Sequence, residues 1–116
     1  MVADLVVNLS QVRRGDVGRV GGKNASLGEL LAALGGQGIR VPQGFATTAA
    51  AYWEFVRANR IDALIATAMA RAESSGSLAA AAAEIRAAFE RGHWPAELEA
   101  AIRAGYRALC AEVGMA

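Results

Sequence analysis

The chain has 116 residues, enough for one domain that buries roughly 65% of the surface its unfolded chain would expose. Its 12 basic and 11 acidic residues give a net charge of +1, so it has no long-range field to attract nucleic acid or an anionic membrane, and both are disfavoured as partners. Although 54% of the residues are hydrophobic, 28 are Ala, which favours helix but adds little buried area per residue.

The chain carries no signal for export, membrane insertion or metal binding. A single cysteine, Cys110, allows no intramolecular disulfide, and no Cys/His cluster has metal-ligand spacing. The N-terminal segment has Asp4 where a signal peptide has positive charge. The Ala-rich stretch 78–88 contains Glu84 and Arg86 and is shorter than the ~20 apolar residues of a membrane span. We therefore expect a soluble, cytoplasmic protein with no metal site of its own.

The first elements in the chain are a strand and a glycine-rich loop. An apolar run at residues 5–7, in which Val6 and Val7 are β-branched, ends at Asn8 and Ser10 and predicts a strand over residues 4–9. Four glycines lie between Arg13 and Lys23, a density that predicts a loop able to adopt positive φ or to lie close to a ligand. These glycines are Gly15, Gly18, Gly21 and Gly22.

A helix and a second extended segment follow. Four leucines at helical spacing predict a helix of about ten residues that ends at Gly35–Gly36; they are Leu27, Leu30, Leu31 and Leu34. Ile39 and Val41 alternate with polar residues and predict a short extended segment that turns sharply before Phe45.

The rest of the chain is predicted to be helical. Thr47 or Thr48 caps a helix that ends near Asn59. The next helix begins at Ile61 and stops at the Ser74–Ser77 break, and a third runs from Leu78 to Gly92. Pro95 opens the last helix, whose acidic first turn suits the helix dipole. The fold class is therefore α+β, with short N-terminal strands and a mostly helical remainder. Since two strands form no independently stable sheet, the sheet needs strands that this chain lacks.

Residues 20–27, VGGKNASL, contain the only pattern that suggests chemistry. A glycine-rich turn runs straight into a helix, with Lys23 at the junction. Unpaired N–H groups and the positive end of the dipole at a helix N-terminus attract anions, and glycines let the anion approach the backbone. The segment is not a Walker A motif, because Asn24 stands where Ser or Thr is required and Val17 where Gly is expected. Judged by pattern alone, an ordinary loop with a solvated lysine is the commoner case.

Two longer segments resemble a known family. GRVGGKNASLGELL, followed after a short gap by IRVPQGFATTAAAYWEF, is similar to the N-terminal region of phosphoenolpyruvate synthases in order and spacing. The resemblance runs from about Val17 to Phe55 and continues in pattern to Glu112. It implies that residues 1–116 are the truncated N-terminal part of an ATP-grasp-like nucleotide-binding domain.

The resemblance also implies roles for individual residues. Lys23 would bind ATP phosphates, Gly21 and Gly22 would shape the loop around it, and Arg19 stands where the family motif often has arginine. No catalytic residue and no metal ligand follow for this chain. The ligands of Mg²⁺ are expected outside it.

The family converts pyruvate, ATP and water to phosphoenolpyruvate, AMP and phosphate. The resemblance implies that the partners of this chain are ATP and the remainder of the parent enzyme, including a phosphohistidine domain and a pyruvate-binding domain. Phosphoryl transfer depends on positioning and charge neutralisation, so Lys23 alone is expected to give no turnover. Two alternatives stay open: a piece of a rifampicin-type phosphotransferase, against which Asn24 argues, and a non-catalytic helical module that binds a protein partner.

Overall fold

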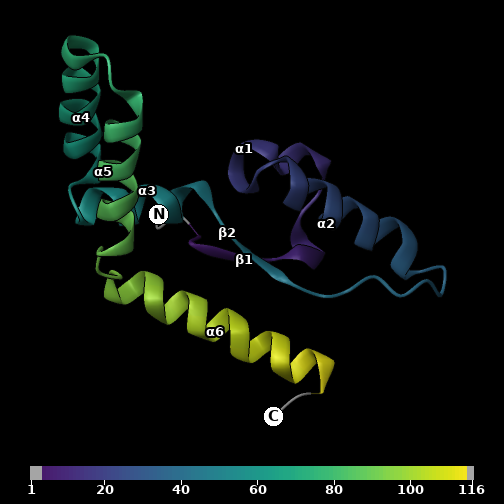
Figure 1. Cartoon of the computed structure of the whole chain (residues 1–116). Helices are drawn as coiled ribbons and strands as arrows, with labels where there is room; N and C mark the ends of the chain where they lie inside the picture. The colour runs from purple at the N-terminus through teal and green to yellow at the C-terminus, as the bar shows by residue number, and fades with distance from the viewer. Residues whose placement is uncertain (1–3, 115–116) are drawn as a thin grey trace. The chain divides into compact units, whose positions relative to one another are not determined.

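The computed structural model describes residues 4–114 and has an α+β fold (Figure 1). Its elements in chain order are β1 (Val6–Asn8), the 3-10 helices η1 (Leu9–Gln11) and η2 (Arg14–Asp16), α1 (Val17–Val20), α2 (Gly22–Gly35), β2 (Phe45–Thr47), α3 (Ala49–Ala58), α4 (Ile61–Ser75), α5 (Leu78–Glu90) and α6 (Ala96–Val113). The chain divides into two compact units. We call Met1–Tyr52 with Ala96–Ala116 the sheet unit, and Trp53–Pro95 the helical unit.

The sheet unit contains an antiparallel pair, β1 and β2, in which Val7 lies opposite Ala46. The first strand is shorter than predicted, because the Asn8 side chain accepts a hydrogen bond from the Ser10 N–H at 2.9 Å and the chain tightens into η1. The prediction of the second extended segment at residues 39–41 was wrong about its place. The strand lies at residues 45–47, after Gly44.

Helices lie on both faces of this small sheet. One face carries Val7 and Ala46, which belong to the larger core cluster of the sheet unit; its buried members are Val7, Leu9, Val12, Val20, Ala25 and Ala46, with Leu27 and Leu31 of α2 packed against them. The other face meets α6, where a Cβ added at Gly105 would lie 3.0 Å from the side chains of Phe45 and Val6. The absence of a side chain at Gly105 therefore sets how closely α6 approaches the sheet.

The predicted loop between Arg13 and Lys23 is wrong, because most of it is helical. Asp16 accepts a hydrogen bond from the Arg13 N–H at 2.9 Å and closes the turn of η2, which leads directly into α1. Only Gly21, with φ of 85° and ψ of 163°, needs a backbone that other residues avoid. The glycine density therefore indicated one sharp junction between two helices and not a long loop.

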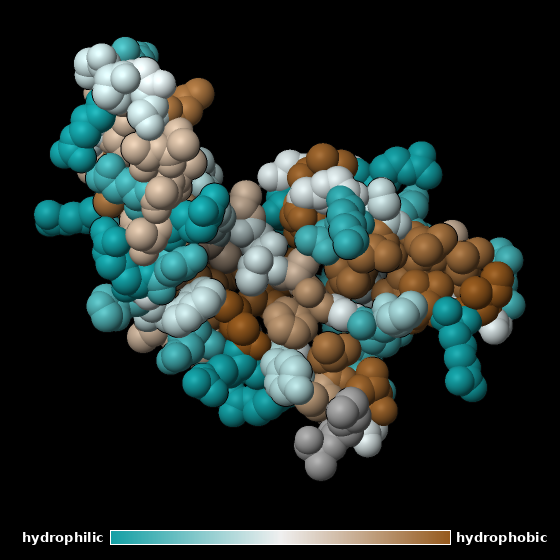
Figure 2. Space-filling view, in the orientation of Figure 1, coloured by the Kyte–Doolittle hydropathy of each residue, from teal (hydrophilic) through white to brown (hydrophobic). Residues whose placement is uncertain are grey.

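The predicted helix after this junction is confirmed, and Leu27 and Leu31 of the leucine stripe pack against the core, but the buried face is shifted away from Leu30. Ala25 and Gly28 are the buried residues of α2, whereas Leu30 is 44% exposed. Gly28 allows this packing because a Cβ there would lie 2.4 Å from the carbonyl oxygen of Val12. Figure 2 shows apolar surface gathered over α2 and the segment after it, to which the exposed Leu30 and Ile39 belong.

The helices predicted after residue 48 are confirmed. Thr48 caps α3, accepting a hydrogen bond from the Ala51 N–H at 3.3 Å. In the helical unit, α4 and α5 pack along each other (Figure 1) through the small residues Ala68, Ala72 and Ala81. A second cluster lies nearer the start of α4 and contains Val56, Ile61, Ala88 and the stacked rings of Phe55 and Phe89.

Asn59 stabilises the turn after α5. Its side-chain oxygen accepts a hydrogen bond from the His93 N–H at 2.7 Å, and its amide donates to the carbonyls of His93 and Phe55, both at 2.9 Å. The exposed His93 is thus held through its backbone. Within residues 4–114, no helix has the length and apolar character needed to cross a bilayer.

Candidate phosphate-binding site

The start of α2 presents three backbone donors without a partner in the described structure. The Gly21 N–H donates to Val17 at 2.8 Å and the Ala25 N–H donates to Gly21 at 3.0 Å. Between them, the N–H groups of residues 22–24 lie in the first turn of the helix and have no intrahelical acceptor. Gly21 has no side chain to cap them, and the first turn contains no acidic residue. The first turn of this 14-residue helix therefore supplies no negative charge to offset the helix dipole.

Lys23 lies in this first turn as the second residue of α2. The sequence predicted it to be the residue at which the turn meets the helix, so the helix begins one residue earlier than expected. Its side chain is exposed and has no ion pair or hydrogen bond with any other described residue. It is also the only lysine in the sequence, all other basic residues being arginine or His93. An exposed ammonium thus belongs to the same helical turn as three unpaired N–H groups, a donor set that suits a phosphate.

Gly21 and Gly22 leave the space in front of these donors open. A Cβ built at either position meets no atom within 4 Å. At Gly21 the positive φ independently favours glycine, whereas Gly22 has ordinary helical geometry. Asn24, the residue used above to separate two families, donates from its side chain to the carbonyl of Val20 at 2.9 Å. It therefore ties the end of α1 to the start of α2.

Arg19 lies on α1 and is held by two carboxylates. Its guanidinium is 3.4 Å from Asp4 and 3.8 Å from Asp16. Sequence reasoning missed both partners, although the i, i+3 spacing of Asp16 and Arg19 was a usable signal. An Arg19 neutralised in this way contributes less positive charge to the site than Lys23 does.

The described residues contain no group of three or more His, Cys, Asp or Glu side chains placed to hold a metal ion. The arrangement at the start of α2 can bind and orient an anion.

Comparison with known proteins identifies the family. The model of the family "Pyruvate phosphate dikinase, AMP/ATP-binding domain" matches residues 17–116, which include all four predicted site residues. The phosphoenolpyruvate synthase of Neisseria meningitidis is 41% identical over 98% of this chain, that of Escherichia coli K12 is 41% identical over 93%, and that of Pseudomonas aeruginosa is 39% identical over 93%. The chain spans only 14 to 15% of the length of these relatives. From the match over residues 17–116, the chain belongs to the family of the AMP/ATP-binding domain of pyruvate phosphate dikinase.

Proposed function

We propose that this chain is the ATP-phosphate-binding N-terminal segment of a phosphoenolpyruvate synthase, which converts pyruvate, ATP and water to phosphoenolpyruvate, AMP and phosphate. The observation that carries the proposal is the open donor set at the start of α2, where Lys23 stands beside three unpaired N–H groups. The relatives named above, which are phosphoenolpyruvate synthases, support the choice of enzyme.

In this proposal, residues 1–116 are the first part of an ATP-grasp-like domain. Lys23 and the N–H groups of the first turn of α2 bind phosphate oxygens of ATP, and Gly21 keeps their approach open. Arg19 contributes by positioning, since Asp4 and Asp16 hold its guanidinium next to the junction. The site works in the cytoplasm, where the lone Cys110 stays reduced.

Other parts of the parent enzyme complete the reaction. Mg²⁺ would neutralise phosphate charge during transfer, and we place its ligands outside this chain. The phosphohistidine and pyruvate-binding domains are further partners outside it. The chain by itself is therefore expected to form no AMP from ATP and pyruvate in the presence of Mg²⁺, and AMP formation that follows the purified chain would contradict this.

The direct test removes the lysine from a protein in which this chain is joined to the rest of its ATP-binding domain. A charge-assisted hydrogen bond contributes roughly 1.5 to 3 kcal/mol, so Lys23→Met should weaken ATP binding about ten- to a hundredfold in calorimetry. The matched control is Arg14→Met, which removes the same charge from an exposed residue of η2. Equal affinity of the Lys23→Met variant and the parent would show that the site is wrongly assigned.

A second readout uses the fact that Lys23 is the only lysine of this chain. ATP bound at the start of α2 should protect its amine from acylation, and mass spectrometry of the peptide that contains Lys23 measures the protection. Labelling of the chain's N-terminal amine serves as the internal control. Unchanged acylation of Lys23 at saturating ATP would place the nucleotide elsewhere.

A further inference from the structure

The two-stranded sheet has an open edge on each side. Val7 and Ala46 lie opposite each other, flanked by the hydrogen bonds from Thr48 to Leu5 at 3.1 Å and from Leu9 to Gly44 at 3.0 Å. In an antiparallel pair, positions that bond to the partner strand alternate with positions whose N–H and C=O groups point away from it. Here residues 5, 7 and 9 and their partners 48, 46 and 44 are the bonded positions. Val6 and Asn8 therefore present backbone groups at the edge of β1, and Phe45 and Thr47 present them at the edge of β2. In the described part of the chain, neither edge has a further strand.

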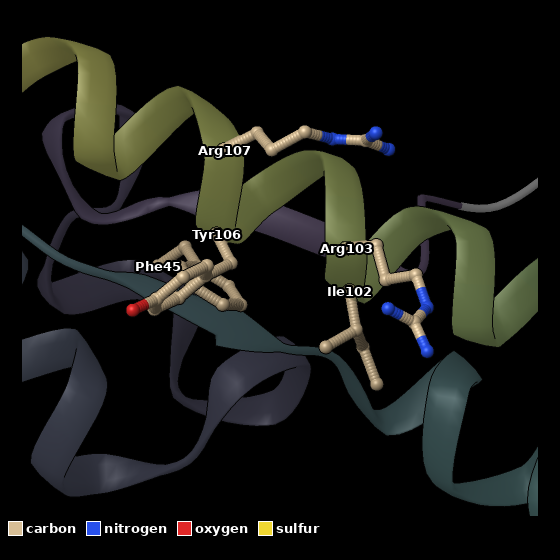
Figure 3. A pocket seen from close by; sticks show the side chains of 5 residues that line it. All are labelled: Phe45, Ile102, Arg103, Tyr106 and Arg107. Carbon is tan, nitrogen blue, oxygen red and sulfur yellow. The ribbon is translucent and has the colours of Figure 1, made fainter. Parts of the chain in front are cut away.

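The surface beside the edge of β2 differs in charge from the surface beside the edge of β1, because α6 presents different residues on each side of the sheet. Beside β2 lies a pocket of about 370 Å³ lined by apolar side chains of Phe45, Ile102 and Tyr106 together with Arg103 and Arg107 (Figure 3). Beside β1, a pocket of about 400 Å³ is lined by Asp4 and Glu97 among small and aliphatic residues.

The arginines beside β2 retain capacity for an anionic partner. Figure 3 shows Arg103 and Arg107 extending from α6 away from the rings of Phe45 and Tyr106, so the apolar floor of the pocket stays uncovered by them. Arg103 makes only a long contact, 3.7 Å, with the exposed Glu99, and Arg107 has no ion pair within residues 4–114. An apolar side chain in the pocket, next to a carboxylate, would satisfy both features.

We propose that the edge of β2 receives an additional β-strand, supplied by another part of the parent enzyme, which places an apolar side chain against Phe45 and Tyr106 and carboxylates opposite Arg103 and Arg107. The named relatives have about 85% of their length outside the region that this chain matches, so a parent enzyme of that size has ample chain from which such a strand could come. Main-chain hydrogen bonds at Phe45 and Thr47 supply the binding affinity. The apolar pocket and the two arginines determine that the strand binds at the edge of β2 and not at that of β1. The inference does not depend on Lys23 or on ATP.

A second copy of this chain is a poorer occupant. Antiparallel pairing of two β2 strands would bring Arg103 and Arg107 of one copy towards the same two residues of the other, and like charges disfavour that contact. The edge of β1 is disfavoured for an acidic strand by Glu97; Asp4 lies beside the same edge but is paired with Arg19.

Joining a test strand to the full chain through a flexible Gly/Ser linker makes the proposal measurable. The strand has about six residues, the usual strand length, with Glu, Val and Glu at every second position so that all three side chains face α6, and Thr at the positions between them; the control strand has Lys in place of Glu. With an effective concentration in the millimolar range and a Kd of about 0.1 mM, amide exchange at Phe45 and Thr47, measured by NMR, should slow about tenfold. Exchange at Val6 and Asn8 should not change.

Three outcomes would overturn the proposal: equal protection by the Lys strand, protection at the edge of β1 instead, or a concentration-dependent dimer in sedimentation that protects Phe45 and Thr47 without any strand. Thr47→Pro removes an outward donor of β2 and should abolish the protection, whereas Val6→Pro makes the same change on β1 and should not. Should the proline variants unfold, the double variant Arg103→Glu with Arg107→Glu gives an independent answer. It should reverse the preference, so that the Lys strand protects and the Glu strand does not.

Discussion

The sheet unit and the helical unit differ in how far their contacts reach along the chain. In the helical unit, α4 packs on α5 across the short break at Gly76 and Ser77, through residues that a helical pattern brings together. In the sheet unit, β1 pairs with β2 about 40 positions later and both outer edges stay open. The helical unit has no strand edge among its described residues, and the first turn of α4 contains the acidic Asp62. The unit that carries the candidate site leaves donors free at the start of α2 and along both strands, which is what a binding region requires.

The largest effect is expected inside the helical unit, at Ile61. Its side chain is 1% exposed at the start of α4 and contacts the cluster of Val56 and Ala88. Ile61→Ala should lower the free energy of opening of α4 and α5, measured by hydrogen exchange, by about 2 to 5 kcal/mol. The matched control is Met69→Ala on the exposed side of α4, which should stay within about 0.5 kcal/mol. An equal loss in β1 and β2 would show that the two units unfold as one and would remove the distinction between them.

A comparable test of the sheet unit is Gly28→Ala. The added Cβ would lie 2.4 Å from the Val12 carbonyl oxygen, a backbone atom that cannot move aside as a flexible side chain does. Overpacking of this kind costs about 1 to 3 kcal/mol, which outweighs the helix propensity of Ala. Thermal unfolding of the variant should show the loss. Gly22→Ala, where the added Cβ meets open space, is the control and should show none; a stable Gly28→Ala protein would mean that α2 packs less closely on η1.

A smaller effect is expected at the break between α4 and α5. The Ser77 hydroxyl accepts a hydrogen bond from the Ala80 N–H at 3.2 Å and caps α5. Ser77→Ala should cost about 1 kcal/mol in urea unfolding, and Ser77→Asp should restore most of it. If Asp gave no recovery, the turn and not the cap would determine where α5 begins.

The smallest effect concerns the ion pair between α4 and α5. Arg71 lies 3.3 Å from Glu84, and both side chains are substantially exposed. Surface pairs of this kind contribute about 0.2 to 1 kcal/mol and are screened by salt. A double-mutant cycle with Arg71→Gln and Glu84→Gln should therefore give a coupling energy in that range that falls as salt is added. A coupling that salt leaves unchanged would indicate a pair less accessible to water than the structure shows.

How much could be predicted from the sequence also differs between the two units, because it depends on how far apart in the chain the contacting residues lie. Periodicity predicted α4 and α5 with their break, because the residues that pack together lie close in sequence. It misplaced the second strand, since the register of β2 depends on two hydrogen bonds between distant residues: the Leu9 N–H donates to the Gly44 carbonyl, and the Thr48 N–H donates to the Leu5 carbonyl. The leucine stripe of α2 was misleading at Leu30 because Gly28, which has no hydrophobic side chain, makes the closest approach to the core.

The sequence by itself determined the helical content, the near-neutral charge and the placement of a lone lysine after paired glycines, because composition and local spacing are sufficient for these. Only the tertiary structure decided that Gly21 alone bends the backbone between two helices, that Arg19 is held by Asp4 and Asp16, and that the two edges of the sheet face opposite charges. Each of these depends on residues brought together from distant positions or on a backbone dihedral angle, and neither can be read from local sequence patterns.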